Sequence, residues 1–194
     1  MPRKRRTWIP EKFYHIVSRG NRRDPLFYCS EDFEAFFHIL HQLHETHSFE
    51  LASYCLMTNH FHLQLRSTKQ PISKVMSLLN KRFANYFNTR YNVSGHVFEK
   101  RFFAEVIYDY EEMLRVSRYI HLNPVAAHMV DRPELYPWSS YSFYHAAASD
   151  EQMPPYMNLD PILVGYSGTQ KEQEQQYCEM INDWLLEKEL SLSK

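Results

Sequence analysis

Hydrophobic residues recur with two different periods along the chain, and the two periods predict a mixture of strands and helices. Runs rich in aromatic and β-branched residues predict strands over residues 13–18, 49–56, 60–66 and 97–106. Apolar residues that return every three or four positions predict helices over residues 30–46, 72–90, 109–123 and 170–189. The third helix should end close to Asn123, because the residue before Pro124 avoids helical backbone angles.

The order of these elements indicates the fold class. The second and third strands are separated only by Met57, Thr58 and Asn59, a spacing suited to an antiparallel hairpin. Strand, helix, hairpin, helix, strand, helix is an α+β order, so we expect a ferredoxin-like sandwich with a mainly antiparallel sheet and helices on one face. Residues 1–145 should form this domain, and residues 146–194 a C-terminal helical extension packed on or beside it.

Charge is distributed unevenly along the chain, although the net charge is only -1. Residues 1–145 contain 19 basic and 14 acidic residues, whereas residues 146–194 contain 3 and 9. A basic body with an acidic extension is compatible with a nucleic-acid partner, and a solvated surface would explain the same charges equally well. The strongest basic clusters are an N-terminal arm of Arg3, Lys4, Arg5 and Arg6 and a group of Arg19, Arg22 and Arg23.

Composition excludes several classes of protein. No segment approaches the roughly 20 apolar residues that a membrane helix needs, and no apolar stretch of a secretory signal follows the basic N-terminus. Cys29, Cys55 and Cys178 are far apart in the sequence and lack the density of a disulfide framework. We therefore expect a cytoplasmic protein with no membrane partner.

Two histidines flank one apolar residue in His60-Phe61-His62, at the start of the second hairpin strand. Side chains two positions apart on a strand point to the same face, so both imidazoles can reach one divalent metal ion. Two ligands are weak evidence, because an isolated pair of this kind is more often simply polar surface.

Tyr119 and Asn123 change this balance. They lie four residues apart on the third helix, only about 40° apart around its axis, and so share one face. A tyrosine hydroxyl there could attack phosphorus, and the Asn123 amide oxygen could complete a metal ligand set. A bound metal would help a weakly acidic phenol by stabilising the charge that develops on phosphorus. His121 points to another side of the helix. A packed tyrosine beside a helix-terminal asparagine is the structural alternative.

Several segments together resemble the REP-associated tyrosine transposases, within the single-tyrosine, IS200-like HUH transposase superfamily. The motif of that superfamily has a bulky hydrophobic residue between two histidines, and this residue is Phe61 here. The matching segments are Ser18-Arg19-Gly20-Asn21-Arg22-Arg23, Tyr54-Cys55-Leu56-Met57-Thr58-Asn59-His60-Phe61-His62-Leu63, Arg118-Tyr119-Ile120-His121-Leu122-Asn123-Pro124-Val125 and Trp138-Ser139-Ser140-Tyr141.

This resemblance implies an activity and a set of roles. Tyr119 would attack single-stranded hairpin DNA, leaving a 5′-phosphotyrosine and a free 3′ hydroxyl. His60 and His62 would bind Mg²⁺ or Mn²⁺, with Asn123 as the candidate third ligand. We expect a monomer, with a homodimer as the alternative. The candidate DNA-binding residues are Arg3, Lys4, Arg5, Arg6, Arg19, Asn21, Arg22, Arg23, Lys81 and Arg82.

Two other functions are compatible with the sequence. A catalytically idle DNA-binding regulator of the same fold would bind hairpins without cutting them, although it would have little reason to retain Tyr119 and both histidines. An unrelated metal-binding protein would hold Tyr119 far from the two imidazoles.

Overall fold

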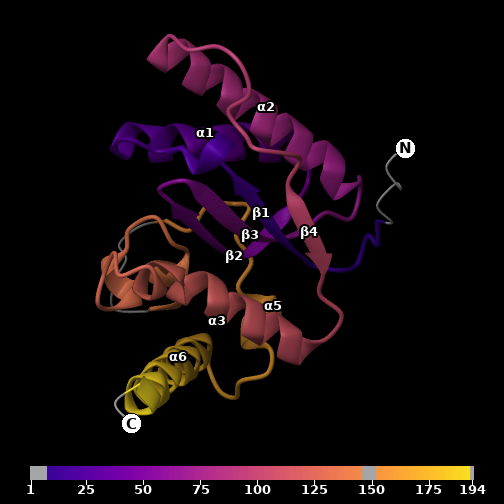
Figure 1. The fold of residues 1–194 in the computed structure, drawn as a ribbon. Coiled ribbons are helices and arrows are strands. Elements are labelled where there is room, and N and C mark those ends of the chain that lie inside the picture. The colour runs from indigo at the N-terminus through magenta and orange to yellow at the C-terminus, as the bar shows by residue number, and fades with distance from the viewer. Residues whose placement is uncertain (1–7, 146–151, 193–194) are drawn as a thin grey trace, which may run out of the picture.

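The computed structural model describes residues 8–145 and 152–192, and in it a four-stranded antiparallel sheet lies between two layers of helices (Figure 1). The order across the sheet is β2-β3-β1-β4. The strands are β1 (Tyr14–Arg19), β2 (Glu50–Met57), β3 (His60–Arg66) and β4 (Phe103–Val106). The basic arm predicted at Arg3 to Arg6 lies outside the described residues.

The predicted hairpin is confirmed. In the register of β2 and β3, Met57 lies opposite His60 and Cys55 lies opposite His62. The other side of β3 pairs with β1, which places Val17 opposite His62 and Arg19 opposite His60. β3 is therefore an inner strand, and its two histidines lie at the hairpin end of that strand.

The helices α1 (Ser30–Thr46) and α2 (Ile72–Tyr91) cover one face of the sheet. The Phe36 ring of α1 lies 4.8 Å from the Phe61 ring of β3. The Asn80 amide of α2 donates a hydrogen bond to Ser18 of β1 over 2.9 Å. Because side chains alternate along a strand, the neighbours of Phe61, which are His60 and His62, face the opposite side.

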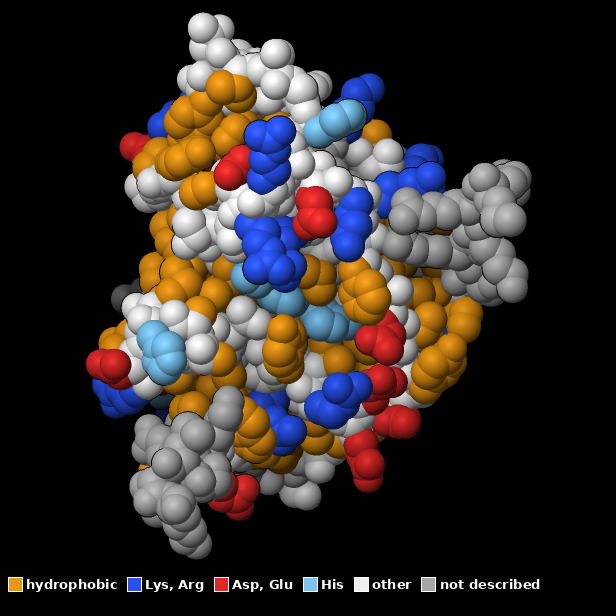
Figure 2. All heavy atoms as spheres, viewed as in Figure 1, with side chains coloured by type: hydrophobic (Ala, Val, Ile, Leu, Met, Phe, Trp, Pro, Cys, Tyr) orange, Lys and Arg blue, Asp and Glu red, His pale blue; other side chains and the backbone are white. Residues whose placement is uncertain are grey.

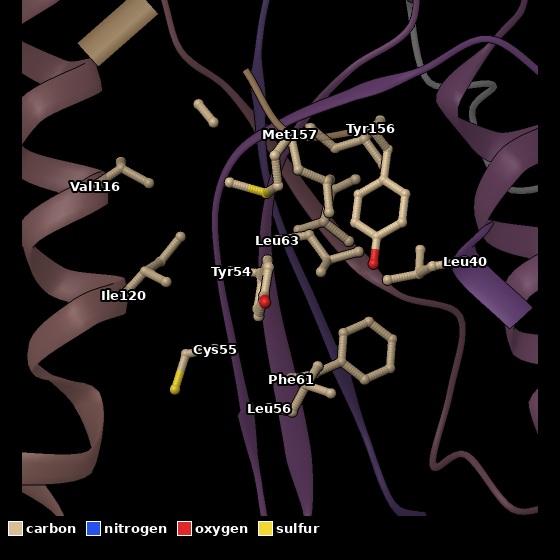
Figure 3. Packing of buried hydrophobic residues seen from close by; sticks show 14 of the residues in the cluster. Leu40, Tyr54, Cys55, Leu56, Phe61, Leu63, Val116, Ile120, Tyr156 and Met157 are labelled. Atoms are coloured by element: carbon tan, nitrogen blue, oxygen red, sulfur yellow. The ribbon is translucent and has the colours of Figure 1, made fainter. Parts of the chain in front are cut away.

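The opposite face is covered by α3 (Tyr110–Ala126), which joins the sheet through Gln64. The Gln64 amide donates to the Met113 carbonyl of α3 over 3.1 Å. Figure 3 shows Val116 and Ile120 of α3 on the Cys55 side of the sheet, and Leu40 and Phe61 on the other side. The antiparallel α+β sandwich is confirmed, but the expectation that the helices share one face is wrong for α3. Residues on both faces of β3 are buried, so helices must pack against both faces of the sheet.

Two predicted boundaries are also wrong. The strand predicted over residues 97–106 is regular only at Phe103–Val106. The backbone groups of Val97 and Glu99 instead bond Asn21 and Arg19, at the irregular turn where β1 ends. The helix predicted to end near Asn123 continues to Ala126. Pro124 lies in its last turn, where a proline removes only one hydrogen bond, and the Pro124 carbonyl still accepts from the Met129 amide over 3.0 Å.

The C-terminal part of the chain packs along the outer edge of β2. Leu56 donates to the Trp138 carbonyl over 2.9 Å, and Leu51 donates to the Tyr156 carbonyl over 2.7 Å. These contacts occupy backbone groups that an edge strand would otherwise expose. The remaining elements are η2 (Pro133–Leu135), α4 (Tyr141–Tyr144), α5 (Asp160–Leu163) and α6 (Gln170–Leu192). No helix within the described ranges is long and apolar enough to cross a membrane.

Candidate active site

The two histidines of β3 lie next to each other under α3. Their ring centroids are 4.9 Å apart, and the rings are nearly perpendicular. His62 is only 3% exposed, whereas His60 is partly open to solvent. Figure 2 shows histidine side chains at the centre of this side of the molecule, with Lys and Arg side chains beside them.

Burial keeps these imidazoles neutral near pH 7. Desolvation and, to a smaller extent, the charge of Arg19 lower the pKa of His60 to about 4, although a hydrogen bond with Asn123 acts in the opposite direction. The pKa of His62 falls well below its ordinary value, mainly through burial and then through the neighbouring His60 and His15. A neutral imidazole has a free lone pair, which is the form that binds a metal ion.

Tyr119 and Asn123 reach the histidines from α3. The Tyr119 ring meets the His62 ring edge to face with centroids 5.4 Å apart, and Tyr119 is 52% exposed. The Asn123 amide nitrogen lies 3.5 Å from Nε2 of His62. The structure thus brings together the four residues that the sequence singles out, and it excludes the alternative in which the hairpin and the helix do not meet.

His15 is a neighbour that the sequence analysis missed. Its Nε2 lies 3.0 Å from Nδ1 of His62, and its ring lies 5.7 Å from the ring of Tyr119. Burial lowers the pKa of His15 to about 4, with a smaller contribution from Arg115. His15 shares a strand face with Val17, which lies opposite His62, but the sequence alone does not specify this pairing of β1 with β3.

The possible metal ligands are two imidazole nitrogens and one amide oxygen. Within residues 8–145 and 152–192, no group of three or more His, Cys, Asp or Glu side chains is arranged to hold a metal ion. His60, His62 and Asn123 form a neutral, mixed donor set that leaves room for phosphate or water oxygens. Such a set fits Mn²⁺ well, because Mn²⁺ accepts imidazole, whereas Mg²⁺ prefers oxygen.

The arginines that follow β1 lie next to the hairpin turn that precedes His60. Residues Asn21–Arg23 form the short helix η1, in which Arg22 and Arg23 adopt left-handed φ angles of 55° and 66°. The Asn59 side chain donates to the Arg23 carbonyl over 3.0 Å. Arg22 and Arg23 are exposed, so their charges are available beside the histidines.

Lys81 and Arg82 lie on α2, across the sheet from the histidines. Lys81 lines a groove between α2 and the segment 95–103, together with Lys100 and Arg101. Arg82 lines a separate, shallow hollow between α1 and α2. The structure does not bring these two candidate DNA-binding residues together with the residues around Tyr119.

A buried polar cluster fixes α3 beside the sheet. His121 contacts the Tyr177 hydroxyl of α6 through Nδ1 over 2.7 Å and the Ser140 hydroxyl through Nε2 over 2.8 Å. The Tyr177 hydroxyl also contacts the Ser117 hydroxyl over 2.5 Å. His121 is fully buried, which lowers its pKa to about 3. Since His121 lies between Tyr119 and Asn123 in the sequence, this cluster positions the helical segment that carries both.

Comparisons with known proteins give the chain a family context. A sequence model of the family described as transposase IS200 like matches residues 10–123, more than half of the chain, and this match includes both histidines, Tyr119 and Asn123. No curated protein matches the sequence.

The solved structures extend the comparison to the fold. The chain is similar to a REP-associated tyrosine transposase bound to a REP hairpin, with a TM-score of 0.64 and 17% identity over 87% of this chain and 93% of that one. A protein from Deinococcus radiodurans R1, described provisionally as a transposase, has a TM-score of 0.43 and 16% identity over 61% of this chain and 95% of that one. At 17% identity, the similarity to the REP-associated tyrosine transposase confirms the fold.

Proposed function

Because the chain belongs to the family of IS200-like transposases, we propose that it cleaves and rejoins single-stranded hairpin DNA through Tyr119. One observation carries the proposal. Tyr119 of α3 lies in ring contact with His62 of β3, yet half of its surface is open to a substrate. A nucleophile that is both accessible and next to neutral metal-binding groups is what phosphodiester cleavage through tyrosine requires.

Tyr119 performs the covalent chemistry in this proposal. Its hydroxyl oxygen forms a bond to phosphorus while the bond between phosphorus and the 3′ oxygen breaks. The phenolic proton is released through solvent, and the departing 3′ oxygen gains one. The 5′ phosphate stays on Tyr119, so the energy of the phosphodiester bond is retained and a 3′ hydroxyl can attack the same phosphorus to rejoin a strand.

His60, His62 and Asn123 are the proposed metal-binding residues. These residues would hold Mg²⁺ or Mn²⁺, which would supply stabilisation of the negative charge that develops on phosphorus during cleavage. The neutral state of both imidazoles supports this role, because neither has to lose a proton to become a ligand near pH 7.

The proposed DNA contacts begin with the arginines beside the site. Arg19 pairs with His60 across the sheet, and Asn21, Arg22 and Arg23 form the short helix beside the turn that leads to His60, where phosphates near the cleaved bond would pass. The groove that holds Lys81 offers a second basic surface, and Arg82 is a weaker candidate because it lies in the hollow beside α1. The REP hairpin bound to the structural neighbour supports a hairpin partner.

We propose that one chain is sufficient for activity. The helix that carries Tyr119 packs on the sheet of its own chain, through Gln64 and through the polar cluster around His121. A homodimer is the alternative, and it would have to form without removing α3 from this position.

The decisive experiment compares the unmodified protein with Tyr119→Phe. Both are incubated with a panel of single-stranded hairpins and Mn²⁺, and covalent protein–DNA adducts are resolved on denaturing gels. We expect an adduct with the unmodified protein and none with Tyr119→Phe. Tyr108→Phe is the matched control, because it removes a hydroxyl from a tyrosine that is 63% exposed and lies outside the site.

The same assay separates the alternative function. A regulator that only binds DNA would retain hairpins in a gel-shift experiment and form no adduct with any divalent metal ion. An adduct that persists in Tyr119→Phe would show that another residue is the nucleophile.

A further inference from the structure

We infer that Asn59 and His15 are positioning residues, which hold His60 and His62 with the proton on Nδ1 so that Nε2 of each ring is free to bind the metal ion. The inference deepens the proposed function and rests on it for the identity of the metal ligands. Neither Asn59 nor His15 is expected to bind the metal or the DNA. Each acts through a hydrogen bond to one histidine.

The contacts of Asn59 determine the state of His60. The Asn59 amide nitrogen donates to the Arg23 carbonyl over 3.0 Å, and a carbonyl can only accept, so the orientation of the amide is determined. Its oxygen then faces Nδ1 of His60 at 2.7 Å. Because an amide oxygen also can only accept, Nδ1 of His60 must be the donor. A neutral His60 with its proton on Nδ1 has its lone pair on Nε2.

His15 has the corresponding role for His62. Nδ1 of His62 and Nε2 of His15 are 3.0 Å apart, so two neutral rings share one proton across this contact. The other nitrogen of His62, Nε2, faces the amide nitrogen of Asn123 at 3.5 Å, and that group is a donor which needs a lone pair. With the Asn123 amide in this orientation, the proton of His62 is on Nδ1 and is donated to His15.

Asn59 also connects the metal ligand to the arginine turn. One amide bonds His60 on one side and the backbone of Arg23 on the other, and Arg23 has a left-handed φ of 66°. Backbone rearrangement at Arg23 would therefore be transmitted to the His60 ring. Outer hydrogen bonds of this kind typically change metal affinity by roughly 10- to 100-fold when they are removed.

The test reads the ring protons directly in the metal-free, full-length protein. Long-range ¹H–¹⁵N spectra of ¹⁵N-labelled protein near pH 7.5 distinguish the two neutral forms of each histidine. We expect His60 and His62 both with the proton on Nδ1. Either ring with its proton on Nε2 would overturn the inference, and this reading needs no variant, no DNA and no activity.

Variants then test the consequence for metal binding, with Mn²⁺ affinity measured by calorimetry. Asn59→Leu removes the acceptor for His60, and His15→Phe removes the acceptor for His62, so each should weaken binding about 10- to 100-fold. Asn59→Asp keeps an oxygen opposite Nδ1 of His60 and should retain the ring state, but it loses the donor to the Arg23 carbonyl. Thr58→Ala is the matched control in the same turn, since Thr58 contributes a backbone carbonyl and not its side chain.

The outcomes distinguish this inference from the proposed function. Unchanged Mn²⁺ affinity in folded Asn59→Leu would contradict the inference even if DNA cleavage were normal. Conversely, the predicted ring states without any DNA adduct would leave the positioning roles intact and would contradict the proposed activity.

Discussion

Removal of a single buried hydroxyl should destabilise the protein measurably, and Tyr177→Phe is the sharpest case. The Tyr177 hydroxyl contacts both Ser117 and His121 of α3, at 2.5 Å and 2.7 Å, and all three side chains are buried. Phenylalanine fills the same space but offers neither a donor nor an acceptor. Two polar groups of α3 would then lose a partner where water does not easily replace it.

The magnitude follows from the cost of leaving buried polar groups unsatisfied. That cost is about 1–3 kcal/mol, and Ser117 can reduce it by turning toward a backbone carbonyl of its own helix. For a chain of this length, each kcal/mol lowers Tm by roughly 2–4 °C. Urea unfolding followed by circular dichroism should therefore show a lower midpoint with an unchanged slope.

Two further variants make the reasoning refutable. Tyr108→Phe removes a hydroxyl from an exposed position and should change the free energy of unfolding by no more than about 0.5 kcal/mol. Adding Ser117→Ala to Tyr177→Phe should recover part of the loss, because removing both partners leaves fewer unsatisfied groups. A change below about 0.5 kcal/mol in Tyr177→Phe would show that the cluster does not hold α3 in place.

Three other predictions concern pH, metal binding and DNA binding. The pKa of His121 is about 3 in the folded protein and about 6.5 in the unfolded chain, so the unfolded chain binds one more proton between these pH values. The contribution of His121 to stability is therefore complete above about pH 6.5, and it falls by about 1.4 kcal/mol per pH unit on acidification. His121→Gln should show a shallower decline of Tm from pH 6.5 to 4, and an unchanged decline would contradict this assignment. Because the pKa of His60 is about 4, Mn²⁺ affinity should stay constant down to about pH 5, whereas a loss centred near pH 6.5 would indicate exposed imidazoles. If Arg22 contacts one phosphate, Arg22→Gln should reduce the slope of log binding constant against log salt concentration by about 0.7 for single-stranded DNA. Filter-binding titrations at several salt concentrations would measure this slope, and an unchanged slope would show that Arg22 does not contact the DNA.

The sequence predicts the parts of the fold that local patterns specify. Alternation of apolar residues and a short turn predict the β2–β3 hairpin, and the hairpin places His60 and His62 on one face. The four-residue spacing of Tyr119 and Asn123 likewise predicts their shared side of α3. In each case the pattern that makes the prediction lies within one short, continuous segment of the chain.

What the sequence could not predict depends on contacts between distant segments. His15 joins the site because β1 pairs with β3 in a particular register, which no pattern within residues 13–18 specifies. The segment 97–102 departs from a regular strand because its backbone bonds the turn after Arg19. α3 crosses to the opposite face because Gln64, Tyr177 and Ser140 offer partners there, and these lie on three separate parts of the chain.

The attachment of α3 to the sheet of its own chain has a genetic consequence. In the proposed mechanism, the nucleophile Tyr119 and the metal ligand His62 come from one polypeptide, so a copy that lacks one and a copy that lacks the other should not combine into a working site. Mixed in one reaction or expressed in one cell, Tyr119→Phe and His62→Ala chains should fail to complement each other. An allele that damages either residue would be rescued only by an intact copy.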